Sequence, residues 1–173
     1  MRISSIVYAA ISIASAVAQS IPAGSQIQLH LANYSTYCLG ATSATLQAPV
    51  LIEVCGAANT TFKIGLDDPT TTGTKFQLVS PATGPGTPVP FLCVTASGSQ
   101  DGSAPLVMDT CEDDKFENWR VGAGEGTGEI VSLAPSDGAF CLTAAGADAG
   151  AAIEYRPCTN DVNQQWTVVV VDN

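Results

Sequence analysis

The sequence predicts an all-β domain made of three copies of one four-stranded unit, and three observations lead to this prediction. Six cysteines fall into three pairs, whose members are 17, 18 and 17 residues apart. A stretch of alternating apolar and polar residues precedes each pair, and such alternation is typical of half-buried strands. The composition is rich in Gly, Pro, Thr and Val and poor in Lys, and no window shows a long amphipathic helix.

The first residues, MRISSIVYAAISIASAVAQS, have the features of a secretory signal peptide. One charge, Arg2, precedes an apolar run, and the small residues Ala16-Val17-Ala18 stand where a signal peptidase cleaves. The apolar run is about 15 residues long, shorter than the roughly 20 that a membrane-spanning helix needs. We therefore expect residues 1–18 to be a cleaved signal, residues 19–173 to form a single domain, and the protein to be secreted into the extracellular space.

The charge balance and the motif content exclude several classes of function. The chain has 16 acidic residues against 6 basic ones, whereas nucleic acids and anionic membranes are bound by basic patches, so neither is an expected partner. The sequence lacks the His/Cys spacing of a metal site and the G-x-S-x-G nucleophile motif. His30, the single histidine, sits at an outward position of the first predicted strand. We therefore expect a monomer without metal, cofactor or catalytic activity.

Two sequence motifs predict glycosylation of a secreted chain. The sequons Asn33-Tyr34-Ser35 and Asn59-Thr60-Thr61 both lie in the mature sequence. An attached glycan is bulky and polar, so a glycosylated asparagine must lie at the surface. We expect Asn33 and Asn59 to be surface positions that can carry glycans.

The cysteine pairs are Cys38 and Cys55, Cys93 and Cys111, and Cys141 and Cys158. Six cysteines allow fifteen connectivities, so their number alone does not choose a pairing. Their equal spacing favours a repeat in which each pair closes its own loop, and a loop of that size would stabilise the fold by about 3 kcal/mol. An aromatic residue follows each second cysteine after seven or eight positions, namely Phe62, Trp119 and Trp166.

The strand that opens each repeat is predicted by apolar residues at every second position. These residues are Ile27, Leu29 and Leu31 in the first repeat, Phe76 and Leu78 in the second, and Val131 and Leu133 in the third. The repeats span approximately residues 22–66, 73–122 and 127–171. One such unit cannot bury its apolar face alone, but three together can close a barrel without free strand edges.

The ends of the three repeats carry a family resemblance. The third repeat ends in Asn163-Gln164-Gln165-Trp166, the second in Glu117-Asn118-Trp119 and the first in Thr60-Thr61-Phe62. Three Cys-to-Cys repeats that end in Gln-x-Trp or a variant of it resemble the ricin B-type β-trefoil lectins, over essentially all of residues 22–171. The resemblance implies a six-stranded barrel capped by three hairpins, with Trp119 and Trp166 in the core.

The sugar-binding positions implied by this resemblance are only partly kept. A working lobe has an Asp two residues after the first cysteine, and this chain has Gly40, Thr95 and Thr143 there. It has an aromatic residue two positions before the second cysteine, and this chain has Glu53, Asp109 and Arg156 there. The third repeat keeps about half of the pattern and the other two keep little, so the predicted carbohydrate-binding residues are Thr143, Glu154, Arg156, Asn163 and Gln164. Strand alternation places the neighbouring Tyr155 in the core.

Two functions of different kinds fit the sequence. The first is a secreted, non-catalytic, lectin-like protein whose partner is a glycan or a glycoprotein. The alternative is a secreted β-trefoil that has lost its sugar sites and binds a protein, for example as a protease inhibitor or an effector. The proline-rich loop Ser80–Phe91 is the segment that such a partner would meet. A structural cell-wall or matrix protein is a third possibility.

Overall fold

The computed structural model describes residues 21–65, 73–79, 91–96, 105–112, 115–134 and 138–171. The predicted signal peptide, residues 1–18, and residues 80–90 of the proline-rich loop lie outside these ranges, so the expectations for them stay predictions. Within the described ranges, the structure contains no helix long and apolar enough to cross a membrane.

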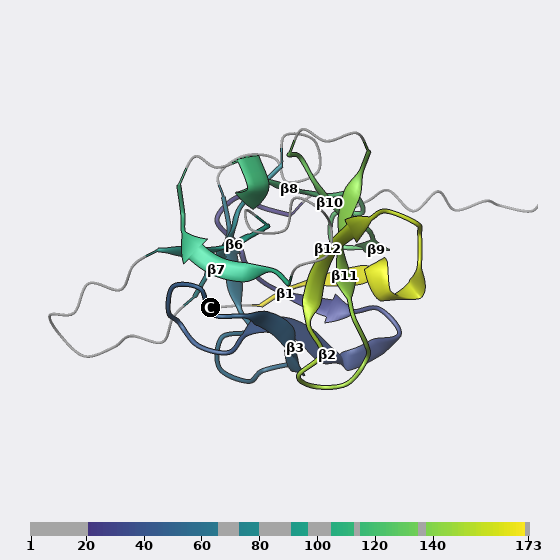
Figure 1. Ribbon diagram of the computed structural model, residues 1–173, viewed down its shortest axis with the longest axis horizontal. Coiled ribbons are helices and arrows are strands. Elements are labelled where there is room, and N and C mark those ends of the chain that lie inside the picture. The colour runs from purple at the N-terminus through teal and green to yellow at the C-terminus, as the bar shows by residue number, and fades with distance from the viewer. Residues whose placement is uncertain are drawn as a thin grey trace, which may run out of the picture.

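Four strands recur in each repeat (Figure 1). The first repeat contains β1 (Gln26–Leu31), β2 (Tyr34–Ala41), β3 (Val50–Val54) and β4 (Phe62–Ile64). The second contains β5 (Phe76–Leu78), β6 (Leu92–Thr95), β7 (Val107–Thr110) and β8 (Trp119–Val121). The third contains β10 (Ile130–Ser132), β11 (Phe140–Ala144), β12 (Ile153–Pro157) and β13 (Trp166–Val170). The remaining elements are the short strand β9 (Thr127–Gly128) and the 3-10 helices η1 (Lys115–Glu117) and η2 (Val162–Gln164).

The first and last strands of each repeat form the barrel. β1 pairs with both β4 and β13, β4 pairs with β5, and β8 pairs with β10. A bridge between Thr74 and Trp119 joins the start of the second repeat to its end. The two middle strands of each repeat form a hairpin instead, namely β2–β3, β6–β7 and β11–β12. This architecture confirms the predicted all-β trefoil of three four-stranded repeats.

The three hairpins contact one another side by side (Figure 1). Isolated bridges link Pro49 to Val107, Leu51 to Ala152, and Pro105 to Glu154. Each hairpin therefore hydrogen-bonds to the other two, which satisfies backbone groups that would otherwise be exposed at strand edges. This triangle of contacts fixes the three hairpins relative to one another.

The aromatic residue that opens the last strand of each repeat lies in the core, as the family resemblance implies for Trp119 and Trp166. Phe62 and Trp119 are 0% exposed and Trp166 is 1% exposed. The indole Nε1 of Trp119 donates to the carbonyl oxygen of Val94 at 3.1 Å, and that of Trp166 donates to the carbonyl oxygen of Leu142 at 3.0 Å. Both acceptors follow the first cysteine of the same repeat, so each indole joins a barrel strand to its own hairpin.

The structure contains the three disulfides that the repeat spacing favoured. Cys38 bonds to Cys55, Cys93 to Cys111, and Cys141 to Cys158. Every bond lies within one repeat and joins the two strands of its hairpin region. None of the cysteines is free.

One predicted strand face is wrong. The residues of β10 that face the core are Ile130 and Ser132, whereas Val131 is half-buried and Leu133 is exposed. Ser132 pairs with Trp119 across the sheet, and paired residues point to the same face, so Ser132 must point inward with the indole. The inward hydroxyl is satisfied because it accepts hydrogen bonds from the Tyr155 hydroxyl, at 3.4 Å, and from the Ala134 backbone N–H, at 3.2 Å.

Other single-residue predictions concern the surface and the edge of the core. Tyr155 is buried, as predicted, with its ring stacked on Phe140 at a centroid distance of 4.6 Å. His30 lies on the face of β1 opposite Leu29 and is half-buried, with Nδ1 2.8 Å from the carbonyl oxygen of Ser35. Asn33 is exposed and Asn59 is partly exposed, so both sequon asparagines are at the surface.

The hydrogen bond of Trp166 can be tested by replacement with phenylalanine. Trp166→Phe removes the donor to Leu142 and leaves a small void, so we expect the free energy of unfolding to fall by about 2–4 kcal/mol. The variant should still fold, because Phe62 occupies the equivalent position of the first repeat. Guanidinium denaturation with the disulfides intact measures the loss. The exposed Tyr34→Phe serves as the control, and an equal effect of both changes would contradict the assignment.

Candidate carbohydrate-binding site

A pocket of about 430 Å³ opens on the hairpin of the third repeat. All five residues that the sequence singled out for carbohydrate binding line it, namely Thr143, Glu154, Arg156, Asn163 and Gln164. The sequence analysis missed two further polar lining residues, Thr159 and Asp161. The fold therefore brings together, from two strands and a 3-10 helix, residues that are up to 21 positions apart in the chain.

The register of the hairpin places three of these side chains on one face. Thr143 of β11 lies directly opposite Glu154 of β12, and Cys141 lies opposite Arg156. Alternate residues of a strand point to the same side, so Thr143, Glu154 and Arg156 all point outward while Leu142 and Tyr155 point into the core. The spacing of these three residues from the cysteines therefore places their side chains on the same face of the hairpin.

The short helix η2 brings the other two predicted residues to the pocket. Asp161 caps the helix, because its carboxylate accepts a hydrogen bond from the backbone N–H of Asn163 at 2.9 Å and its carbonyl accepts one from Gln164 N–H at 2.9 Å. The preceding Asn160 has a φ of 57°, and its backbone N–H donates to the carboxylate of Glu129 at 2.7 Å. Asp161 could have been found as an N-cap signal three residues before Gln164.

Gln164 is the buried support of the pocket. Its Nε2 donates to Thr143 Oγ1 at 2.9 Å and to the carbonyl oxygen of Pro157 at 2.8 Å. Its Oε1 accepts from the backbone N–H of Thr159 at 2.7 Å and from the Thr159 hydroxyl at 3.1 Å. These four bonds use both amide hydrogens and both lone pairs, and the side chain is only 2% exposed. Gln164 therefore positions the walls of the pocket and has no group left for a ligand.

Glu154 and Arg156 form an ion pair at the rim. The Nε of Arg156 donates to a carboxylate oxygen of Glu154, and this hydrogen bond together with the negative charge raises the pKa of Arg156 above its ordinary value. The Arg156 side chain is 53% exposed. Within the described chain, its two terminal nitrogens have no protein partner, so the pair holds a guanidinium that can still donate to a ligand.

Asn163 offers the other free polar group. Its backbone N–H is used by Asp161, but no described protein group bonds to its side-chain amide. An amide both donates and accepts, which suits hydroxyl groups that do the same. The described lining contains no aromatic ring, so the pocket offers hydrogen bonds and the small apolar surfaces of Ala144, Ala145 and Pro157 in place of a stacking platform.

The equivalent place in the first repeat is filled by side chains. Gly40 stands where Thr143 stands in the third repeat, and a Cβ built on it would lie 2.9 Å from Glu53 Cγ and 3.1 Å from the methyl group of Thr60. Thr60, which occupies the position of Gln164, is fully buried and donates to the carbonyl oxygen of Ala57 at 2.8 Å. Glu53 and Thr60 thus take up the space that the third repeat leaves open.

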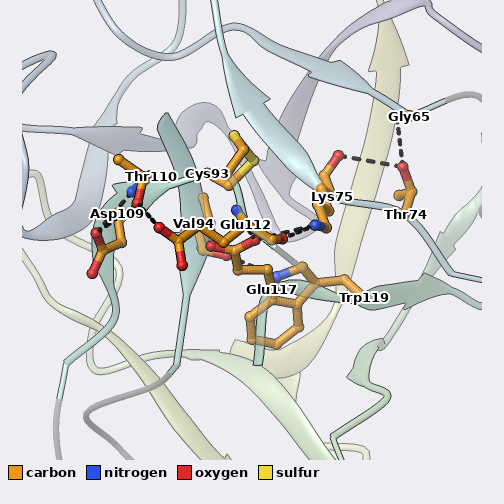
Figure 2. Close-up of a disulfide and its surroundings, with 11 residues drawn as sticks. Gly65, Thr74, Lys75, Cys93, Val94, Asp109, Thr110, Glu112, Glu117 and Trp119 are labelled. Atoms are coloured by element: carbon orange, nitrogen blue, oxygen red, sulfur yellow. Dashed lines mark hydrogen bonds and ion pairs between the residues drawn. A yellow bond between two sulfur atoms is a disulfide. The ribbon is translucent and has the colours of Figure 1, made fainter. Parts of the chain in front are cut away.

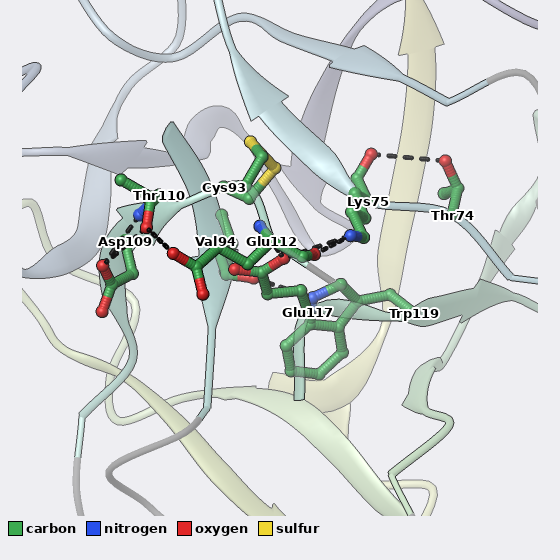
Figure 3. A network of polar contacts seen from close by, with 10 residues as sticks. Thr74, Lys75, Cys93, Val94, Asp109, Thr110, Glu112, Glu117 and Trp119 are labelled. Atoms are coloured by element: carbon green, nitrogen blue, oxygen red, sulfur yellow. Dashed lines mark hydrogen bonds and ion pairs between the residues drawn. A yellow bond between two sulfur atoms is a disulfide. The ribbon is translucent and has the colours of Figure 1, made fainter. Parts of the chain in front are cut away.

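In the second repeat a carboxylate replaces the supporting amide. Glu117 occupies the position of Gln164, and its Oε2 accepts from the backbone N–H of Glu112 at 3.1 Å, just as Gln164 accepts from Thr159. Because Glu117 is 2% exposed, its charge needs a partner, and Lys75 Nζ lies 3.4 Å from it (Figure 3). The sequence analysis missed Lys75, although a buried Glu in place of Gln is a signal that a cation lies nearby.

The six-stranded barrel, the three hairpins and the polar pocket on the third hairpin define a β-trefoil of the lectin type. The family model of the ricin-type beta-trefoil lectin domain matches residues 87–173, and the chain belongs to this family. No curated protein matches the chain.

Solved structures share the fold at low sequence identity. ThreeFoil, a designed 3-fold symmetric protein, is 19% identical with a TM-score of 0.65, and the match covers 84% of this chain and 99% of that one. The Macrolepiota procera ricin B-like lectin, solved in complex with lactose, is 15% identical with a TM-score of 0.59 and coverages of 88% and 100%. The Polyporus squamosus lectin, solved with a human-type influenza-binding epitope, is 13% identical with a TM-score of 0.63 and coverages of 87% and 50%.

The supporting role of Gln164 can be separated from the role of Asn163 by stability. Gln164→Ala removes a buried side chain together with its four hydrogen bonds, so we expect the free energy of unfolding to fall by about 2–4 kcal/mol. Asn163→Ala removes a side chain without protein partners and should change it by less than about 0.5 kcal/mol. Chemical denaturation of both variants provides the comparison, and equal losses would show that Gln164 is not the support.

Proposed function

We propose that this chain is a secreted, non-catalytic, carbohydrate-binding protein whose sugar site is the pocket of the third repeat. The observation that carries the proposal is the contrast within that pocket. Gln164 uses all of its hydrogen-bonding groups on the protein, whereas the Asn163 amide and the terminal nitrogens of Arg156 have no partner among the described residues and line the same pocket. A rigid frame that presents unsatisfied polar groups is suited to binding, because little ordering is needed when the ligand arrives.

The chemistry of the free groups favours a saccharide. Vicinal hydroxyls need neighbouring donors and acceptors, and the pocket supplies the amide of Asn163, the guanidinium of Arg156 and the second carboxylate oxygens of Glu154 and Asp161. Membership of a lectin family and the structural likeness to lectins support the same ligand class. Without a stacking ring, affinity for a single sugar unit should be low and should rest on hydrogen bonds.

The remaining parts of the proposal rest on the sequence and the covalent structure. The predicted signal peptide and three disulfides fit an oxidising, extracellular environment. Two observations support binding without catalysis. Glu154 forms an ion pair with Arg156, and His30 lies in β1, outside the lining of the pocket.

A glycan array with the mature, disulfide-intact protein tests the proposal. Asn163→Ala and Arg156→Ala should each lower the affinity for the bound neutral glycans about tenfold, because each removes one or more hydrogen bonds to the ligand. Arg120→Ala is the matched control, since Arg120 is an exposed arginine on β8 that does not line the pocket. It should bind like the parent protein.

Two results would overturn the proposed function. Folded protein that binds no glycan would favour the alternative in which the partner is a protein. Binding of neutral glycans that survives both Asn163→Ala and Arg156→Ala would place the sugar site elsewhere on the molecule.

A further inference from the structure

A second pocket, of about 340 Å³, lies at the seam between the first and second repeats. It is built where β4, β5 and β6 run side by side, with Lys63 paired to Gln77 and Gln77 paired to Cys93. Thr74, Lys75 and Asn118 complete its polar lining. It shares no lining residue with the pocket of the third repeat.

The seam pocket is a cationic place on an acidic protein. The chain has only 6 basic residues against 16 acidic ones, and Lys63 and Lys75 both line this pocket. The described lining contains no acidic residue. Positive charges gathered in one pocket raise the local concentration of anions.

The two lysines have different roles. The ammonium of Lys75 donates to the carbonyl oxygen of Glu112 and lies 3.4 Å from the buried carboxylate of Glu117, beside the disulfide of Cys93 (Figures 2 and 3). This pairing fixes Lys75 and cancels its charge. Lys63 is exposed, and no described protein group bonds to its ammonium, so the described lining has a net charge of about one unit that can act on a ligand.

The other two seams of the barrel have the same backbone register with different side chains. Arg120, Val131 and Cys141 are aligned at one of them, and Thr167, His30 and Cys38 at the other. At the seam that contains Arg120, the position of Gln77 is occupied by the apolar Val131. At the other seam it is occupied by a histidine whose Nδ1 lies 2.8 Å from the carbonyl oxygen of Ser35. Within the described chain, a free amide beside a free ammonium occurs at the seam of the first two repeats alone.

We propose that the seam pocket binds an acidic saccharide unit, that is, a sugar ring carrying one singly charged oxyanion, a carboxylate or a sulfate ester. A single uncompensated ammonium at Lys63 matches one negative charge better than the two of a phosphate monoester. The Gln77 side chain, which no described group engages, both donates and accepts and so suits ring hydroxyls. The volume is of the order of a small-molecule site and exceeds what a bare ion needs.

The experiment is a titration of the folded, mature protein, followed by amide chemical shifts in NMR spectra. The probes are glucuronate, glucose 6-sulfate, neutral glucose, and acetate and sulfate as free ions. We expect glucuronate or glucose 6-sulfate to shift the amides around Lys63 and Gln77, and the tighter of the two identifies the acidic group. Glucose should leave these amides unchanged, and added NaCl should weaken the binding of the acidic sugars.

Matched variants separate the seam pocket from general charge and from the third repeat. Lys63→Gln should weaken binding of the acidic sugar about tenfold, and Gln77→Ala should weaken it without changing the net charge. Arg120→Gln removes one positive charge from the equivalent strand position of another seam and should have no effect. Asn163→Ala, which disables the proposed sugar site of the third repeat, should leave this binding unchanged, so failure at one site is distinguishable from failure at the other.

Three outcomes would overturn the inference. The first is the absence of shifts around Lys63 and Gln77 with either acidic sugar. The second is an equal loss of binding in Lys63→Gln and Arg120→Gln, which would indicate general electrostatic attraction. The third is acetate or sulfate binding as tightly as the acidic sugars, which would show an adventitious ion only.

Discussion

The return of the chain from each hairpin to the barrel depends on one side chain, which lies two positions before the core aromatic residue. In the third repeat this is Gln164, in the second Glu117 and in the first Thr60. Each is buried and bonds to the backbone of the segment that follows the second cysteine, at Thr159, Glu112 and Ala57 respectively. The described residues of this segment belong to no strand, so this side chain supplies hydrogen bonds that the sheet does not.

The chemical nature of that side chain decides what each repeat presents to solvent. An amide satisfies its neighbours without charge and leaves an open polar pocket above Thr143. A buried carboxylate requires a cation, and Lys75, which directly precedes β5, neutralises it. A short hydroxyl leaves room that Glu53 fills above Gly40. Three repeats with one backbone plan therefore have three different surfaces.

Much of the fold could be predicted from the sequence, because the spacing of cysteines and aromatic residues indicates which residues are buried. Trp119 and Trp166 were placed correctly by the family resemblance, and Tyr155 was placed correctly by strand alternation. The buried face of β10 was predicted wrongly. Ser132 points inward because it pairs with Trp119, and the sequence alone does not reveal which residues pair across strands. The saturation of Gln164 was likewise invisible, since it depends on a carbonyl and a hydroxyl brought close by folding.

The placement of the disulfides has a consequence for how the molecule is divided. Each bond closes within one repeat, so no covalent crosslink spans a seam between repeats. A single backbone cut between repeats would leave two pieces, each with its own intact disulfides. Only strand pairing and the shared core would hold the pieces together, so denaturant without reductant would separate them. Each repeat therefore contains both cysteines of its disulfide, so a repeat can be duplicated, exchanged or reordered in a gene without leaving an unpaired cysteine.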